Sequence, residues 1–180
     1  MGVTTALLTV EEYAQLPEEE TMRTELVEGE IVRMGDARVI HELVKSNGIE
    51  ILAAYVLQNP AWKLFSESMY KLGKRDGPIP DVSLLLRERL ALQNRAGFLE
   101  GAPEVAFEVV SSESAEFLER KINLYLATGS RVVWVAYPLE RTMWSHRATE
   151  SRHLREGQYI EEPDLLPGFR VLVDRFFDGI

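Results

Sequence analysis

The sequence of 180 residues is 46% hydrophobic and 27% charged, carries a formal net charge of −9 and contains no cysteine. These values predict one globular domain over residues 1–180, exclude disulfides and thiolate chemistry, and count against broad nucleic-acid binding, which usually needs a basic surface. Because the sequence shows neither an apolar run of the ~20 residues that span a bilayer nor a signal peptide, we expect a cytoplasmic protein without membrane contact.

The N-terminal third predicts a short helix, a hairpin and a long helix. Thr9 and Glu12 have the spacing of a capping box, so a helix should begin there and end near Pro17. Residues 24–34 form two strand-like runs around an acidic residue and a glycine, a sequence that favours a tight hairpin turn. Apolar residues recur at helical spacing over residues 37–58, which predicts one long helix.

The middle of the chain predicts two strands and a polar connection. Residues 62–72 and 81–86 are rich in strand-forming residues, and the stretch KRDGPIP between them is typical of turns. Residues 87–103 are mostly polar and end in Gly101 and Pro103, so we expect a connecting segment there.

The C-terminal half predicts a strand, a helix and a second strand, followed by a hairpin and an apolar tail. The strands are residues 104–111 and 132–138, and the helix runs from about Ser114 to Ala127, with Gly129 at its C-terminal cap. A right-handed crossover makes such strands parallel. The sequence therefore predicts an α/β fold, with a mixed β-sheet flanked by helices.

Two carboxylates stand at positions of this sheet where a carboxylate is unusual. Asp81 follows a proline and opens a strand, and Glu108 lies inside the apolar strand VAFEVV, on the face of Ala106 and Val110. An unpaired glutamate is costly to bury, and two neighbouring carboxylates can hold Mg²⁺. Each carboxylate also has a purely structural interpretation: Asp81 could simply begin a turn, and Glu108 could pair with an arginine.

A lysine on the following helix completes the candidate site. Phe117, Lys121 and Tyr125 fall at positions i, i+4 and i+8, which places the lysine on an apolar stripe that faces the sheet. A lysine there can orient an attacking water or neutralise the charge of a phosphate. Alternatively, its long side chain could extend past the stripe into solvent.

The histidines do not form a zinc motif, because His41, His146 and His153 are far apart in the sequence. His41 could lie near the carboxylates through the long helix, or it could cap or pack the first helical turn. We find neither a glycine-rich phosphate loop nor a GxSxG nucleophile motif.

The chain resembles the Uma-type putative restriction endonuclease family of the PD-(D/E)XK nuclease superfamily. The resemblance covers nearly the whole chain. It rests on TELVEGEIVRM, His41, PDVSLLL, FLEGAPEVAFEVVSSES, ERKINLYLATGSRVVWVAYP and LLPGFRVLVDRFF, in the family's order and with similar gaps.

The resemblance implies a restriction-endonuclease-like fold with Asp81, Glu108 and Lys121 as catalytic residues and the two carboxylates as ligands of Mg²⁺ or Mn²⁺. The superfamily lysine usually follows the acid by two residues, where this chain has Val110; Lys121 takes that role from the helix. Glu25 is similar to a further acidic site position, although it could also be an exposed hairpin residue.

The implied activity is hydrolysis of DNA phosphodiester bonds by a homodimer. Two departures from the family pattern, Ser111-Ser112 and Ala136-Tyr137-Pro138, leave the three catalytic positions intact. The alternative function is a catalytically inactive nuclease-fold module that binds nucleic acid or a protein partner, and the acidic net charge favours it.

Overall fold

A computed structural model describes residues 7–35, 38–94 and 97–180. Its centre is a six-stranded mixed sheet with the strand order β10-β9-β8-β7-β5-β3. Only β7 and β8 are parallel, and every other neighbouring pair in this sheet is antiparallel. The six strands are β3 (Trp62–Ser66), β5 (Val82–Leu86), β7 (Val105–Val109), β8 (Val132–Tyr137), β9 (Thr142–His146) and β10 (Ser151–Arg155). The predicted α/β class is confirmed.

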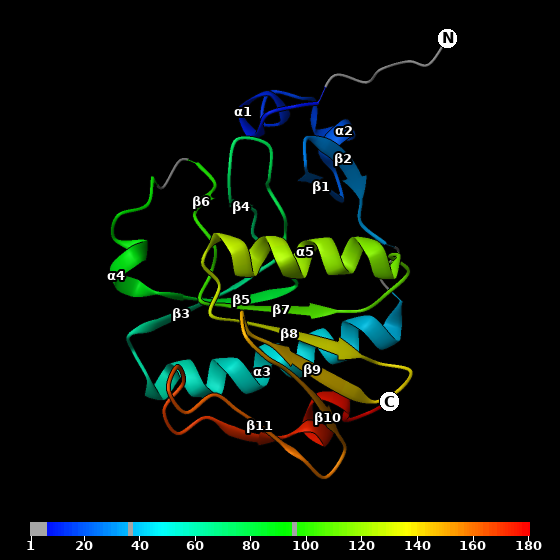
Figure 1. The fold of residues 1–180 in the computed structure, drawn as a ribbon, viewed down its shortest axis with the longest axis vertical. Coiled ribbons are helices and arrows are strands. Elements are labelled where there is room, and N and C mark those ends of the chain that lie inside the picture. Colours follow the sequence, from blue (N-terminus) through cyan, green and yellow to red (C-terminus); the bar gives the residue numbers. More distant parts are fainter. Residues whose placement is uncertain (1–6, 36–37, 95–96) are drawn as a thin grey trace.

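Helices cover both faces of this sheet (Figure 1). Helix α5 (Ala115–Thr128) lies on one face, and α3 (Val39–Gln58) lies on the other together with the 3-10 helix η1 (Val173–Phe177). Because α5 connects the parallel strands β7 and β8, it forms the crossover that the sequence predicted. None of the helices in the described ranges is both long and apolar enough to cross a membrane.

The alternation of β7 divides the core into two layers. Val105, Phe107 and Val109 pack on the α3 side with residues of η1, whereas Ala106 packs on the α5 side. Successive side chains of a strand point to opposite faces, so this alternation fixes which face receives Glu108. The residue follows Ala106 to the α5 side, as the sequence predicted.

The caps of α5 also agree with the sequence. The Ser114 side chain accepts a hydrogen bond from the backbone N–H of Phe117, and Gly129 ends the helix with a φ of 121°. A glycine is favoured at this position because a residue with a side chain rarely adopts such a φ. The two caps set where the helix begins and ends, and Lys121 lies between them on the side of the helix that faces the sheet.

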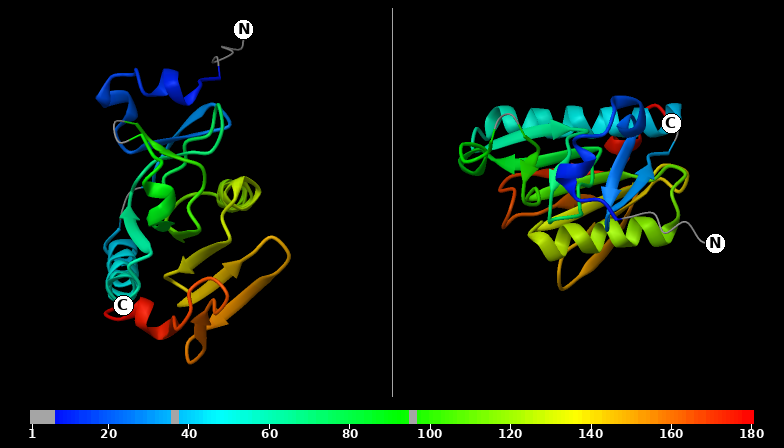
Figure 2. Two further views of the ribbon diagram at one scale, coloured as in Figure 1. Left: turned by 90° about the vertical axis from the view of Figure 1, so that its left-hand side faces the viewer. Right: turned by 90° about the horizontal axis from the view of Figure 1, so that it is seen from above.

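A third cluster of elements lies at the end of the molecule that carries the N-terminus (Figures 1 and 2). It contains α1 (Val10–Tyr13), α2 (Glu18–Thr21) and the hairpin of β1 (Thr24–Val27) and β2 (Glu30–Arg33). The Thr9 capping box is present, but the first helix ends at Tyr13 rather than near Pro17. Glu28 and Gly29 both have positive φ, which is the geometry of the predicted tight turn. A small core of Val10, Tyr13, Leu26 and Met69 supports the cluster.

Three predicted segments differ from the observed elements. The predicted strand 62–72 is interrupted at Glu67, whose φ of 47° breaks the extended backbone, so a short β4 (Tyr70–Lys71) follows β3. The connection 87–103, apart from residues 95–96 outside the described ranges, contains α4 (Arg87–Leu90) and β6 (Leu99–Glu100). The apolar tail contains the antiparallel pair β11 (Tyr159–Glu161) and β12 (Arg170–Leu172) before η1.

The predicted helix 37–58 corresponds to α3, although residue 37 lies outside the described ranges. Gly48, which weakens this helix by propensity, has a packing role. A Cβ atom built on Gly48 would clash with Cε1 of the Phe107 ring and lie 3.0 Å from its Cδ1. The glycine therefore allows α3 to approach the centre of the sheet closely.

We expect Gly48→Ala to destabilise the protein, although alanine is the better helix former by about 1 kcal/mol. The added methyl group would displace the fully buried Phe107 ring, and overpacking of this kind costs about 1–3 kcal/mol. Urea unfolding measures the change. Ser46→Ala, at an exposed position of the same helix, is the control and should leave the free energy of unfolding nearly unchanged. A Gly48→Ala variant more stable than the wild type would contradict the packing role.

Candidate active site

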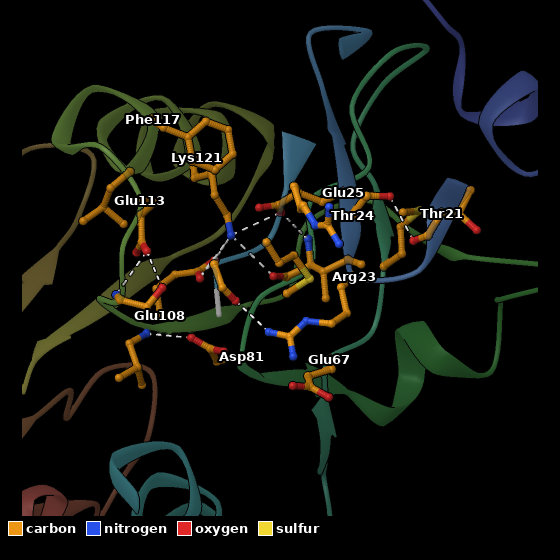
Figure 3. A pocket seen from close by; sticks show the side chains of 18 of the residues that line it. Thr21, Arg23, Thr24, Glu25, Glu67, Asp81, Glu108, Glu113, Phe117 and Lys121 are labelled. Atoms are coloured by element: carbon orange, nitrogen blue, oxygen red, sulfur yellow. Dashed lines mark hydrogen bonds and ion pairs between the residues drawn. The ribbon is translucent and has the colours of Figure 1, made fainter. Parts of the chain in front are cut away.

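A pocket of about 810 Å³ opens between the hairpin, the N-terminal part of α3, α5 and the ends of β5 and β7. Its lining includes all five residues that the sequence singled out: Glu25, His41, Asp81, Glu108 and Lys121. Figure 3 shows four of them converging from the sheet, the hairpin and α5. The fold thus brings together residues that are up to 96 positions apart (121 − 25 = 96).

Asp81 joins β5 to β7 and to α3. Its Oδ2 accepts a hydrogen bond of 2.7 Å from the backbone N–H of Val109, and its Oδ1 lies 3.4 Å from Nε2 of His41. The side chain is therefore held next to the end of the strand that carries Glu108. A role limited to starting a turn does not account for these contacts.

Glu108 is enclosed between the sheet and α5. Its Oε1 lies 3.0 Å from Nζ of Lys121 and accepts a hydrogen bond of 2.9 Å from the hydroxyl of Tyr125. The pairing with an arginine that the sequence left open is thus wrong, because the partner is a lysine. Burial raises the pKa of Glu108 to about 8 against the opposing charge of Lys121, and the nearby carboxylates of Asp81 and Glu25 add to the rise.

Lys121 ends between two carboxylates and not in solvent. Its Nζ lies 3.2 Å from Oε2 of Glu25, opposite the contact with Glu108, and its side chain is 7% exposed. Extension past the apolar stripe into solvent is therefore wrong for this chain. Burial lowers the pKa of Lys121, but the two carboxylates outweigh it and hold the pKa above its ordinary value. The lysine stays protonated, so Glu108 is the member of the pair whose charge depends on pH.

Glu25 is buried at the base of the hairpin, so its description as an exposed residue is wrong. Its Oε2 accepts a hydrogen bond of 2.9 Å from the backbone N–H of Ile79. Backbone hydrogen bonds between Leu26 and Gly77 attach the hairpin to the same loop. Glu25 therefore links the hairpin to the loop before Asp81 and supplies the second partner of Lys121.

His41 is placed by the first turn of α3 and does not cap it. Its Nδ1 lies 3.2 Å from Oε1 of Glu42, and its Nε2 faces Asp81. Burial lowers the pKa of His41, yet the two carboxylates outweigh this effect and raise the pKa above its ordinary value. The other histidines lie elsewhere. The rings of His146 on β9 and His153 on β10 both stack with the ring of Trp144. They take no part in the site.

Three basic residues that the sequence did not single out also line the pocket. Lys45, one turn after His41, is held at 2.7 Å by Glu42 and at 2.8 Å by Glu67. Arg23, which directly precedes β1, and Arg33, the last residue of β2, also line the pocket. Arg33 lies in the TELVEGEIVRM segment and Arg23 directly precedes it, so their charge was visible in the sequence, but their convergence depends on how the hairpin docks.

The donor atoms suit a hard divalent cation bound by few protein ligands. Within the described ranges, no group of three or more His, Asp or Glu side chains is arranged to hold a metal ion. Mg²⁺ does not need such a cage, because it retains waters and commonly uses one or two carboxylates together with substrate phosphate. Asp81 and Glu108 provide two carboxylates; burial is the main cause of the raised pKa of Glu108, the charge of Asp81 adds to it, and a cation would favour the ionised form of both groups.

Comparison with known proteins gives a family and a fold. A family model described as Uma2, putative restriction endonuclease, matches residues 10–174. A solved structure from Anabaena variabilis ATCC 29413, described as a putative nuclease belonging to DUF820, is similar with a TM-score of 0.82 and 21% identity. The match covers 94% of this chain and 97% of that one, and at this identity it shows the fold alone. No curated protein matches the chain.

The raised pKa of Glu108 predicts a pH-dependent contribution to stability. From its ordinary value of 4.5 up to about 8, the folded chain retains a proton that the unfolded chain has released. The free energy of unfolding contributed by Glu108 therefore falls as pH rises through this window, by at most about 1.4 kcal/mol per pH unit.

Glu108→Gln removes this contribution. We expect the difference in unfolding free energy, wild type minus variant, to decline between about pH 5 and pH 8 when both are unfolded by urea in EDTA. Other titrating groups cancel in this difference. A difference that stays constant with pH would show that Glu108 is already ionised at the lower end of the window.

Proposed function

We propose that this chain, which belongs to the Uma2 family of putative restriction endonucleases, hydrolyses phosphodiester bonds of DNA in a reaction that depends on Mg²⁺ or Mn²⁺. One observation carries the proposal: Asp81, Glu108 and Lys121 meet in a pocket that is open to solvent. Two carboxylates beside a protonated lysine provide a place for a cation and a positive charge for a phosphate in the same small volume.

Asp81 and Glu108 would hold the cation, which when bound would supply Lewis-acid polarisation of the phosphate and a more acidic water. The protein itself fixes the two carboxylates. The backbone N–H of Val109 and the imidazole of His41 hold Asp81, and the hydroxyl of Tyr125 holds Glu108. Groups fixed in this way need little rearrangement when a substrate arrives.

Lys121 would act on the charge that develops during hydrolysis. Its ammonium group is protonated and already lies 3.0 Å from a proposed cation ligand, so it would stand beside a phosphate bound to that cation. There it can orient the attacking water and stabilise negative charge on the phosphate oxygens. The ion pair with Glu25 helps to hold the ammonium group in this position.

A homodimer forms part of this proposal. One pocket offers a single pair of carboxylates with a single lysine, which suits cleavage of one strand. Cutting both strands of a duplex calls for a second copy of the site, and a two-fold symmetric dimer is the commonest arrangement that provides one.

A second candidate function is a nuclease-fold module that binds nucleic acid or a protein without cutting. The observation that favours it is the pairing of Lys121 with two carboxylates at once, because a lysine held in this way is less available to a substrate. The net charge of −9 points the same way. Binding of a divalent cation separates the two candidates.

We expect wild-type protein to bind Mn²⁺ and Mg²⁺ in calorimetry, and Asp81→Ala with Glu108→Ala to abolish that binding. The matched control is Glu104→Gln. Glu104 is also a buried carboxylate beside β7, but it accepts hydrogen bonds from the backbone of Leu86 and from Arg89 at the opposite end of the strand. Its neutralisation should cost stability and leave cation binding intact. Wild-type protein that binds neither cation at millimolar concentration, alone or with DNA, would exclude the metal-dependent mechanism.

Lys121→Met should separate catalysis from cation binding. Removal of the ammonium relieves its repulsion of the cation and also raises the pKa of Glu108 further, so Mn²⁺ should still bind, with an affinity that increases with pH. The rate of DNA cleavage should fall by about 10²–10³, the usual loss for a charge-stabilising group. Plasmid nicking in Mn²⁺ measures the rate, and circular dichroism shows whether the variant is folded. Cleavage at the wild-type rate would remove Lys121 from the mechanism.

A further inference from the structure

The cations of the pocket fall into two classes. Lys45 and Lys121 are each held by two carboxylates at distances between 2.7 and 3.2 Å. Arg23 and Arg33 line the same pocket, yet neither makes an ion pair with another described residue. Arg33 has no side-chain partner at all in the described ranges, and Arg23 uses one of its five N–H groups, on the carbonyl of Gly35 at 2.6 Å.

This difference is notable because carboxylates are abundant in the pocket. Its lining includes Glu42, Glu67 and Glu113 besides the carboxylates of the candidate active site. Glu42 and Glu67 are taken by Lys45, and Glu113 accepts hydrogen bonds from the backbone and hydroxyl of Ser111. The two guanidinium groups therefore remain available for an anion that enters from solvent.

Both arginines stand at the same end of the hairpin. Arg33 pairs in register with Thr24, the first residue of β1, and Arg23 directly precedes Thr24, so the two residues are close in space and both line the pocket. Figure 3 shows the Arg23 side chain extending into the pocket from the hairpin side, opposite α5 and Lys121. Arg33 also lines a second, smaller hollow with Ser112 and Ser114, so this residue borders both hollows.

The backbone around Arg23 holds this arrangement in place. Arg23 has a φ of 56°, in the left-handed region that residues with side chains rarely adopt, and its carbonyl accepts a hydrogen bond of 2.8 Å from the N–H of Met34. Strained residues of this kind concentrate at functional sites. Gly35 lies against the loop after β7, because an added Cβ would come within 2.6 Å of the hydroxyls of Ser111 and Ser112.

We propose that Arg23 and Arg33 form a phosphate clamp, which holds the DNA backbone next to the phosphodiester bond that Asp81, Glu108 and Lys121 act on. The inference rests on the proposed nuclease function and assigns substrate positioning to the hairpin. A planar guanidinium matches two phosphate oxygens at once, so two arginines without ion pairs that line one pocket can hold consecutive phosphates of one strand. Such a clamp would also allow an acidic protein to hold DNA, because the attraction between the two guanidinium groups and the phosphates acts only within the pocket.

The test is DNA affinity as a function of salt. Binding of a short fluorescein-labelled duplex, and of the same single strand, is followed by anisotropy in Ca²⁺, which takes oxygen ligands as Mg²⁺ does. Arg33→Ala and Arg23→Asn should each weaken binding about tenfold, the loss expected for one charge-assisted contact. Each should also lower the slope of log affinity against log salt by about 0.9 for duplex or about 0.7 for single strand.

Asparagine is chosen at position 23 because it tolerates the left-handed backbone, so the variant removes the charge and keeps the conformation. If Arg23→Asn fails to fold, Arg33→Ala at an exposed strand position still decides the question. Arg131→Ala is the charge-matched control: Arg131 is exposed, lies outside the pocket and precedes β8 next to Glu104. Arg33→Lys should restore much of the salt slope and only part of the affinity, because lysine lacks the bidentate geometry.

Unchanged affinity and slope in both arginine variants would overturn the clamp, as would an equal loss in Arg131→Ala, which would indicate a general charge effect. These outcomes are distinct from failure of the proposed function. Both clamp variants should bind Mn²⁺ as the wild type does, since neither arginine contacts a proposed cation ligand. Loss of DNA affinity in a protein that binds no cation would support the clamp and place it in a non-catalytic module.

Discussion

The structure depends on one constraint, which is the burial of charge on the α5 side of the sheet. Glu25, Asp81, Glu108 and Lys121 are all 3–6% exposed, and none of them could remain ionised there alone. Each is therefore tied to a different element: the hairpin, the start of β5, β7 and α5. The ion pairs of Lys121 and the hydrogen bond from Val109 to Asp81 fix how these elements meet. The same contacts that make the burial tolerable also gather the chemical groups.

The hairpin completes this arrangement from outside the main sheet. β1 and β2 form a separate two-stranded sheet, attached by Leu26 and Gly77 and supported by its own small core. Glu25 of the hairpin reaches inward to Lys121, and Arg33 and the preceding Arg23 line the same pocket. The hairpin, together with the residue before it, thus contributes one buried anion and two cations to the same pocket.

Local sequence patterns predicted what local physics determines. Strand alternation placed Glu108 on the correct face, helical spacing placed Lys121 toward the sheet, and the Thr9 capping box began a helix. The contact of His41 with Asp81, the pairing of Lys45 and the convergence of the two hairpin arginines depend on tertiary docking, which no local period encodes. The break at Glu67 was missed for a related reason, since its positive φ is sustained by a backbone hydrogen bond to Asp81. The roles of Asp81, Glu108 and Lys121 in catalysis stay predictions.

The negative net charge and the proposed substrate can be reconciled through the position of the charges. Long-range repulsion between an acidic protein and DNA is screened beyond about 8–10 Å at ordinary ionic strength, whereas contacts within a pocket are screened much less. In the protein without a cation, burial raises the pKa of Glu108, and the charges of the nearby carboxylates add to the rise. A bound cation would reverse the sign of that local field, favour the ionised form of Glu108 and add binding energy to the folded state alone. The burial and charge that oppose ionisation of Glu108 in the absence of a cation are therefore the features that would favour a divalent ion together with the phosphate that accompanies it.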